Sequence, residues 1–288
     1  MGVWFFYSLS AALFVSLTDA ISKKALRSES TPLIAWVRCT YAIPYLLLIL
    51  PFVDFPSLDR TFFYICLILS PLEIISVLLY LKAIKISPLS LTLPFLSLTP
   101  VFLIVTSYLI LGESVDISGF TGILLVTSGA YLMNLHTIRH GILEPLKAVI
   151  RERGSLLMIL VAFIYSITSN LGKIAIQHSS PLFFSVFYPI LLSIILFPLI
   201  ILKNGKKEIS SKLLTKKTFY IIGVFQALEI ISHFMAVTLI EVPYMISVKR
   251  TSLLFGIIFG AIFFGETNIR ERLVGGIVMI IGVVLISI

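Results

Sequence analysis

The feature that most constrains this chain of 288 residues is a succession of ten apolar segments. Crossing the hydrocarbon core of a bilayer takes about 20 mostly apolar residues in an α-helix. Segments of that length lie at roughly 3–22, 33–53, 61–81, 87–110, 117–135, 155–175, 181–202, 217–238, 243–264 and 271–288. Most connections are short, so we expect an all-α polytopic membrane protein with ten transmembrane helices.

The composition agrees with this interpretation and excludes several classes of protein. Hydrophobic residues make up 58% of the chain and charged residues 12%, whereas a soluble domain carries about 25% charged residues. That leaves too little polar surface for a soluble enzyme or a nucleic-acid-binding module. Cys39 and Cys66 both lie in apolar segments and predict neither a disulfide framework nor a metal site.

The sequence also repeats itself. The stretch Leu72–Ser76 recurs as Leu228–Ser232, 156 residues later, and Gly112-Glu113 recurs as Gly265-Glu266, 153 residues later. Further matches, at offsets of 150 and 153 residues, join Lys23 to Lys173, Gly122 to Gly275 and Gly129 to Gly282. Several matches in the same order indicate a duplicated unit of five helices.

We therefore divide the chain into a first repeat at 1–135, a linker at 136–154 and a second repeat at 155–288. In the linker, Pro145 opens a stretch that is either an interfacial amphipathic helix or a plain connection. Because each repeat has an odd number of helices, the second must enter the membrane from the opposite side. Inverted repeats with a site between them are an architecture of secondary transporters.

The cationic residues are divided unevenly between the two sides of such a bundle. Loops after the odd-numbered segments hold 17 Lys and Arg residues, whereas the other side holds only Arg60 and Lys173. The positive-inside rule places the richer side in the cytoplasm and both termini outside. We expect a multi-pass protein of the cytoplasmic membrane.

Each repeat ends its fourth segment with the same motif, followed by a short polar turn and a glycine-containing fifth segment. The two copies read Leu111-Gly112-Glu113-Ser114 and Phe264-Gly265-Glu266-Thr267. In this respect the chain resembles the EamA-type transporters of the drug/metabolite transporter superfamily. The resemblance implies a ten-helix exporter or exchanger with a central cavity lined by the first, third, fourth, sixth, eighth and ninth helices. It does not name a substrate.

Three ionisable side chains lie where the bilayer disfavours them. Glu73 is in the third segment, and Glu229 and His233 are in the eighth. Such groups usually face a cavity or the interior of the bundle. Burial makes a carboxylate easier to protonate, and histidine titrates near neutral pH, so all three are candidates for proton coupling. The alternative is structural: an ion pair for each acid, and a hydrogen-bonded packing position for His233.

Lys249 and Arg250 are adjacent cations in the middle of the ninth segment. They resemble an adjacent basic pair on the same helix of phosphate-translocating members, and they suggest that the substrate carries an anionic group. The alternative is neutralisation by Glu73, Glu229 or Asp19. At an offset of 153 residues the pair falls on Leu96 and Ser97, so any anion site belongs mainly to the second repeat.

Other polar residues receive structural interpretations. Asp19 is expected at a solvated helix end, and Arg38 in the head-group region. Glu113 and Glu266 are expected to cap the following helix or to form ion pairs at its start. The prolines of the fourth segment, at positions 88, 94 and 100, predict bends.

Together these features predict a secondary active transporter that moves a small polar or amphipathic metabolite by alternating access. It would export or exchange an anionic or zwitterionic substrate. The expected substrate-binding residues are Lys249, Arg250, Glu73, Glu229, His233, Tyr80, Ser76 and Ser232. The alternatives are a cationic drug/proton antiporter that uses Glu73 and Glu229 and, outside this class, a membrane-embedded lipid-handling enzyme.

The expected partners are a small-molecule substrate, the lipid bilayer and a coupling proton. No motif predicts a cofactor, a metal ion, a nucleic-acid partner or enzyme activity. The sequence lacks a phosphate-binding loop of the G-x-x-x-x-G-K-[ST] type, so it has no ATPase of its own.

Overall fold

The structure, a computed structural model, describes residues 2–132, 152–204, 215–264 and 269–287, and the described part is entirely helical. Residues 136–151 of the linker predicted at 136–154, and the second copy of the Gly-Glu motif, lie outside these residues. The first repeat comprises α1 (Val3–Ala25), α2 (Thr31–Leu46) continued by the 3₁₀ helix η1 (Leu47–Phe52), α3 (Arg60–Ile86), α4 (Leu89–Thr92), the 3₁₀ helix η2 (Leu93–Ser97), α5 (Leu98–Leu111) and α6 (Ile117–Leu132).

The second repeat follows the same order. It comprises α8 (Arg153–Gln177), α9 (Pro181–Asn204), α11 (Lys217–Val237), α12 (Val242–Lys249), α13 (Ser252–Phe264) and α14 (Ile269–Ser287). Eight spans are long and apolar enough to cross a membrane, and Ile117–Leu132 and Val274–Ser287 add two shorter apolar helices. The predicted fold class, ten helices in two five-helix repeats, is confirmed.

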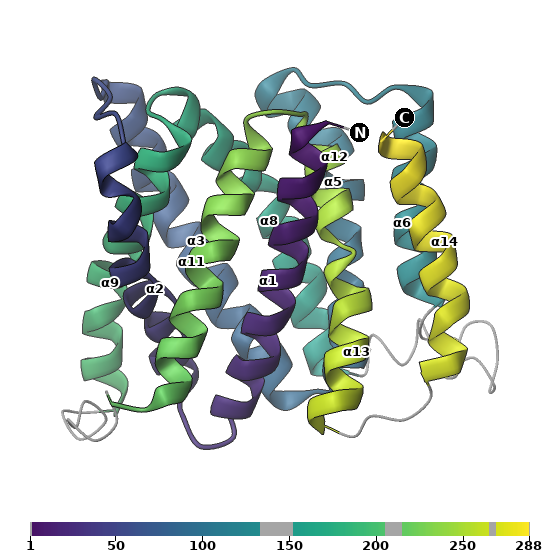
Figure 1. Ribbon diagram of the computed structural model, residues 1–288, viewed down its shortest axis with the longest axis horizontal. Coiled ribbons are helices and arrows are strands. Elements are labelled where there is room, and N and C mark those ends of the chain that lie inside the picture. Colours follow the sequence, from purple (N-terminus) through teal and green to yellow (C-terminus); the bar gives the residue numbers. More distant parts are fainter. Residues whose placement is uncertain (1, 133–151, 205–214, 265–268, 288) are drawn as a thin grey trace.

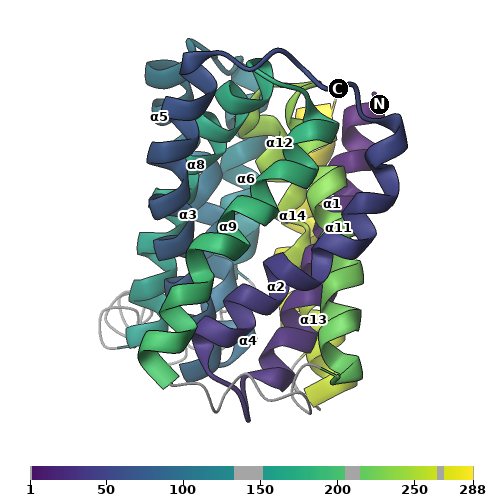
Figure 2. The ribbon, with the colours of Figure 1, turned by 90° about the vertical axis from the view of Figure 1, so that its left-hand side faces the viewer.

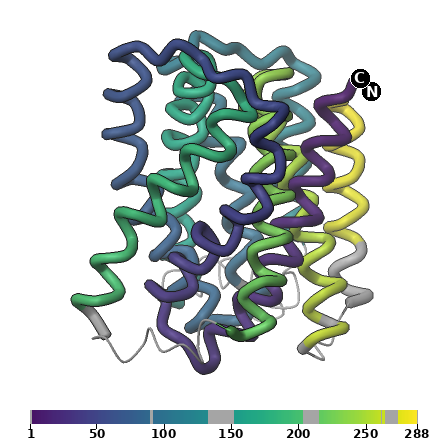
Figure 3. Tube along the Cα trace, turned by 60° about the vertical axis from the view of Figure 1, so that its left-hand side comes forward, coloured from purple at the N-terminus to yellow at the C-terminus, as the bar shows by residue number. Residues whose placement is uncertain are grey.

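The bundle has two ends that matter for function (Figures 1 and 3). Both chain termini lie at one end, which we call the terminus face. The turn between α1 and α2, residues 26–30, lies at the opposite end, which we call the turn face. Helices α2 and α9, equivalent members of the two repeats, cross each other on one side of the bundle (Figure 2).

Local sequence explains where several helices begin. The side chain of Ser30 accepts a hydrogen bond from the backbone N–H of Leu33, and Pro32 follows in the first turn. The Asp59 carboxylate accepts the backbone N–H of Phe62 at 2.9 Å in the same way. Side-chain caps of this kind satisfy backbone donors that a helix start leaves unpaired.

The fourth helix of each repeat is broken, and the two breaks match. In the first repeat α4, η2 and α5 replace one helix, because Pro94 and Pro100 lack the N–H that a regular helix needs. In the second repeat α12 ends at Lys249 and α13 starts at Ser252, so the continuous helix predicted at 243–264 is wrong at this point. No proline lies at this break. Instead the backbone N–H groups of Arg250 and Thr251 bond to carbonyl groups three residues earlier.

The fifth helices of the two repeats, α6 and α14, lie side by side at one edge of the bundle (Figure 1). Their glycines permit this contact. A Cβ atom at Gly282 would meet the carbonyl oxygen of Gly122 at 2.6 Å, and one at Gly129 would meet that of Gly275 at 2.6 Å. These glycines therefore allow close helix packing. The two contacts are equivalent to each other, because Gly122 corresponds to Gly275 and Gly129 to Gly282 in the repeat.

Replacing Gly282 by valine is expected to lower the stability of the fold. Overpacking of a tight contact typically costs about 1–3 kcal/mol, and here the obstacle is backbone rather than a flexible side chain. The measurement is thermal unfolding of the purified protein in detergent. Gly172→Val is the matched control, because a Cβ atom at that helical position meets nothing within 4 Å. Equal melting temperatures for the two variants would contradict the prediction.

Candidate functional site

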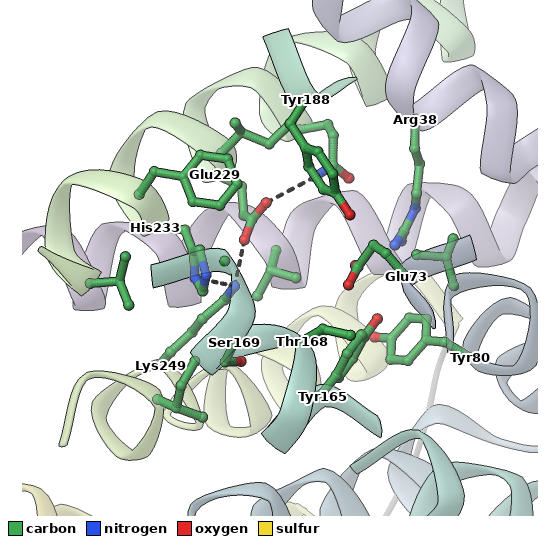
Figure 4. A pocket seen from close by; sticks show the side chains of 18 of the residues that line it. Arg38, Glu73, Tyr80, Tyr165, Thr168, Ser169, Tyr188, Glu229, His233 and Lys249 are labelled. Carbon is green, nitrogen blue, oxygen red and sulfur yellow. Dashed lines mark hydrogen bonds and ion pairs between the residues drawn. The ribbon is translucent and has the colours of Figure 1, made fainter. Parts of the chain in front are cut away.

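A cavity of about 210 Å³ lies in the interior of the bundle, between the two repeats. The first, third, fourth, sixth, eighth and ninth helices, which the family resemblance implies as cavity-lining, all contribute to its wall. So do α2 and α9, through Arg38 and Cys39 and through Phe184, Tyr188 and Leu192. Most of the wall is apolar or aromatic, with a few charged groups among these side chains (Figure 4). Such a cavity suits a ligand with an apolar body and a small number of polar groups.

The first charged group is an ion pair within the second repeat. Lys249 Nζ lies 2.5 Å from Glu229 Oε1 and 3.0 Å from His233 Nδ1. Gln226 Nε2 donates a hydrogen bond of 2.9 Å to the other oxygen of the same carboxylate. Figure 4 shows Glu229, His233 and Lys249 joined on one side of the cavity. Lys249 and Glu229 therefore neutralise each other, as the structural alternative predicted.

Arg250 is different, although it is the next residue. It is 7% exposed and lines the cavity at the break between α12 and α13. Its Nη2 atom donates a hydrogen bond of 2.9 Å to Thr99 Oγ1, and its Nε atom is buried with no hydrogen-bond partner. Among the described residues it forms no ion pair with a carboxylate. The unused donors of a buried guanidinium can bind a carboxylate or phosphate group.

Glu73 is the second cavity group without a counter-charge. Its carboxylate points into the cavity among Tyr165, Thr168 and Tyr188 (Figure 4). In the part of the chain that the structure describes, Glu73 forms no ion pair, unlike its repeat equivalent Glu229. Among the described residues that line the cavity, Glu73 is thus an acid and Arg250 a cation without an ion pair.

A second buried ion pair belongs to the first repeat and corrects two predictions. Arg38 Nη2 lies 2.5 Å from Asp19 Oδ1, and its Nε atom donates to Ser22 Oγ. Tyr80 donates its hydroxyl to the other Asp19 oxygen. Asp19 is 4% exposed and Arg38 8%, so neither a solvated helix end nor a head-group position is right. The two charges are buried because each supplies the counter-charge of the other.

The remaining predicted residues separate into two groups. Tyr80 and His233 line the cavity, each with its polar atom already bonded to a charged group. Ser76 and Ser232 are buried but do not line the cavity. Ser76 donates instead to the backbone carbonyl of Glu73 on its own helix. Tyr165, Thr168 and Tyr188 line the cavity without having been predicted, since isolated hydroxyls in apolar helices give no distinctive pattern.

At the terminus face, Glu113 joins the two repeats. Its Oε1 atom lies 2.6 Å from Lys173 Nζ, and its Oε2 atom accepts the backbone N–H of Val242, the first residue of α12, at 2.9 Å. Lys173 also donates to the carbonyl of Ile240 at 2.7 Å. The prediction that Glu113 caps or pairs at the start of the following helix, α6, is therefore wrong: it caps α12 and pairs with Lys173 of α8.

Asp116 caps α6 instead. Its carboxylate accepts hydrogen bonds from Ser118 Oγ and the N–H of Gly119, and it also accepts one from the hydroxyl of Tyr244. These donors stabilise the charged form, which holds the pKa of Asp116 below its usual value. Tyr244 lies on α12, so this contact also connects the repeats at the terminus face.

The turn face carries an equivalent lysine contact. Lys23, the repeat equivalent of Lys173, donates to the carbonyl of Ser87 at 2.8 Å. Ser87 and Ile240 are themselves separated by the repeat offset of 153 residues. The hydroxyl of Ser87 then donates to Glu152, the N-cap of α8. The same lysine-to-carbonyl contact thus occurs at both ends of the bundle.

Comparison with known proteins identifies a family and a similar solved structure. A family model described as the EamA-like transporter family matches residues 2–135 and 152–288. No curated protein sequence matches the chain. Among solved structures, one titled only as the crystal structure of a protein superposes with a TM-score of 0.73 at 12% identity. The match covers 98% of this chain and 95% of that one. At this identity it shows a common fold alone.

Proposed function

The chain belongs to the EamA-like transporter family, and from this premise we propose that it is a secondary active transporter of a small amphipathic metabolite. The substrate would be zwitterionic or anionic. It would cross the cytoplasmic membrane by alternating access and would be exported or exchanged. The observation that carries this proposal is the pair of unpaired charges, Glu73 and Arg250, on one largely apolar cavity.

The argument rests on charge balance. Ion pairs account for Asp19 with Arg38, Glu229 with Lys249, and Glu113 with Lys173. A charged side chain left unpaired in a low-dielectric interior is costly, so a ligand that neutralises it gains binding energy. A substrate acid group would pair with Arg250, and an ammonium group would pair with Glu73. The aromatic wall would receive the apolar part of the same molecule.

One alternative receives support from the same observation. Glu73 without a cationic partner would also suit a cationic drug/proton antiporter, in which a proton and a drug compete for one carboxylate. Glu229 supports that alternative less well, because Lys249 already neutralises it. The two functions differ in their dependence on Arg250, which a cationic drug does not need.

Arg250→Gln is expected to lower transport of an acid-bearing substrate about 10- to 100-fold, since a hydrogen bond to a charged group contributes about 1.5–3 kcal/mol. The measurement is uptake into proteoliposomes of a panel of anionic, zwitterionic and cationic metabolites, with and without a proton gradient. Lys82→Gln is the matched control, because it removes an exposed cation that does not line the cavity. An Arg250→Gln protein that moves anionic and zwitterionic compounds at the wild-type rate would overturn the assignment.

A further inference from the structure

The two repeats differ at one position that faces an acid. Glu73 and Glu229 are repeat equivalents, and Lys249 neutralises Glu229 at 2.5 Å. The residue equivalent to Lys249 in the first repeat is Leu96. Leu96 is 4% exposed and lines the same cavity as Glu73. The first repeat therefore keeps the acid and replaces its cation by hydrocarbon.

The backbone supports this equivalence. Lys249 is the last residue of α12, directly before the break in the fourth helix of its repeat. Leu96 lies in η2, two residues before α5 resumes the fourth helix of the other repeat. Since the breaks match in position, a lysine at residue 96 would lie next to Glu73, as Lys249 lies next to Glu229.

The neighbouring cations do not fill the gap. Arg38 is paired with Asp19, and Lys173 is paired with Glu113 at the terminus face. Lys249 places its ammonium on Glu229 and His233. Arg250 hydrogen-bonds to Thr99 and forms no ion pair with Glu73. Because no cation in the described part of the chain neutralises Glu73, its counter-charge would come from a bound ligand, or the carboxylate would take up a proton.

We propose that Leu96 is a specificity-determining residue: by placing hydrocarbon where the second repeat has an ammonium, it reserves Glu73 for a cationic group of the substrate. This inference rests on the proposed transport function and deepens it. Arg250 would select for an acid group, while position 96 would decide whether the substrate must also carry a positive charge.

The test converts the first repeat to the pattern of the second. The variant is Leu96→Lys, compared with Leu96→Met, which retains hydrocarbon at this position. The readout does not need the natural substrate: a hydrophobic carbodiimide modifies accessible intramembrane carboxyl groups, and mass spectrometry of the peptides identifies Glu73 and Glu229 separately. Phenethylammonium, a primary ammonium on an apolar body, serves as the cationic probe.

In the wild-type protein and in Leu96→Met, Glu73 is expected to be labelled and phenethylammonium to slow its labelling several-fold. In Leu96→Lys, labelling of Glu73 is expected to fall about tenfold or more without the probe, since the new ammonium occupies the carboxylate. Labelling of Glu73 in Leu96→Lys at the wild-type rate would overturn the proposal. So would labelling of the wild-type protein that responds to pH but not to the probe, because the cation would then be a proton.

A second variant keeps the proposal falsifiable if Leu96→Lys does not fold. Phenethylammonium is expected to raise the melting temperature of the wild-type protein and not that of Glu73→Gln. An equal shift in both would contradict the role of Glu73. Uptake by the wild-type protein in proteoliposomes is measured separately. If the wild-type protein transports a substrate but the labelling and melting experiments give a negative result, only the role of Leu96 in reserving Glu73 is contradicted. If the wild-type protein transports nothing, the proposed function is contradicted.

Discussion

Lys249→Met is expected to destabilise the protein by about 3–5 kcal/mol, because breaking a buried ion pair leaves an uncompensated charge in the interior. The charge left behind is Glu229, whose side chain is 9% exposed. Gln226 would still donate to it, but an amide supplies no positive charge. The measurement is the free energy of unfolding in mixed micelles, taken from a denaturant titration followed by tryptophan fluorescence.

The double variant Glu229→Gln/Lys249→Met separates charge from packing. It removes both charges at once, so most of the lost stability is expected to return. Lys82→Met makes the same substitution at an exposed lysine of α3 and is expected to change stability by less than about 0.5 kcal/mol. If Lys249→Met and Lys82→Met unfold alike, the ion pair is not a stabilising element of this bundle.

The fold could be predicted from the sequence because hydropathy acts over whole segments. About 20 apolar residues have few alternatives to a transmembrane helix, and five matched segments in each half fix the repeat. The break at Arg250 was not predictable in the same way. The prolines of the first repeat predict the bend in its fourth helix. The fourth helix of the second repeat is broken at the equivalent place, although no proline lies at that break. The break in the second repeat could be predicted only by comparing its fourth helix with the equivalent helix of the first repeat.

The sequence predicts which charged residues line the cavity, but not which of them form ion pairs with one another. Glu73, Glu229, His233, Lys249 and Arg250 all line the cavity, as expected from charges within apolar segments. Sequence spacing does not say which acid meets which cation, because the partners come from different helices. The sequence presents Lys249 and Arg250 as one adjacent pair, whereas the structure separates them into a neutralised ammonium and a guanidinium without an ion pair among the described residues.

Asp19 and Arg38 show a second limit. The sequence predicts a helix end for Asp19 and an interface for Arg38, since a single charge near the end of a segment is usually solvated or snorkels. They are instead paired inside the bundle, 19 residues apart in sequence. A simple charge balance could have found them: with Asp19 counted as buried, an additional buried cation was required.

Lys173→Met is expected to make the cavity more accessible from the terminus face. Lys173 lines the cavity and is 8% exposed. It connects α8 to Glu113 and to the carbonyl of Ile240, two residues before α12. In alternating access, opening this end separates such contacts. Losing a charged hydrogen bond of about 1.5–3 kcal/mol would raise the open population about 10- to 100-fold.

The measurement uses a cysteine at Ser169, a cavity residue one helical turn from Lys173, in a protein lacking Cys39 and Cys66. A membrane-impermeant thiol reagent is applied to one side of oriented membranes at a time. Reaction of this cysteine from the terminus face is expected to accelerate about tenfold or more in Lys173→Met. Lys173→Arg, which keeps a donor and a positive charge, is expected to react close to the parent rate.

Lys23→Met is the matched control, because Lys23 makes the equivalent contact with the carbonyl of Ser87 at the turn face. If the two lysines close opposite ends, Lys23→Met accelerates the reaction from the turn face and slows it from the terminus face. A general loosening of the bundle would instead accelerate both reactions in both variants. That result would contradict a closing role for Lys173 and leave the lysines as ordinary structural contacts.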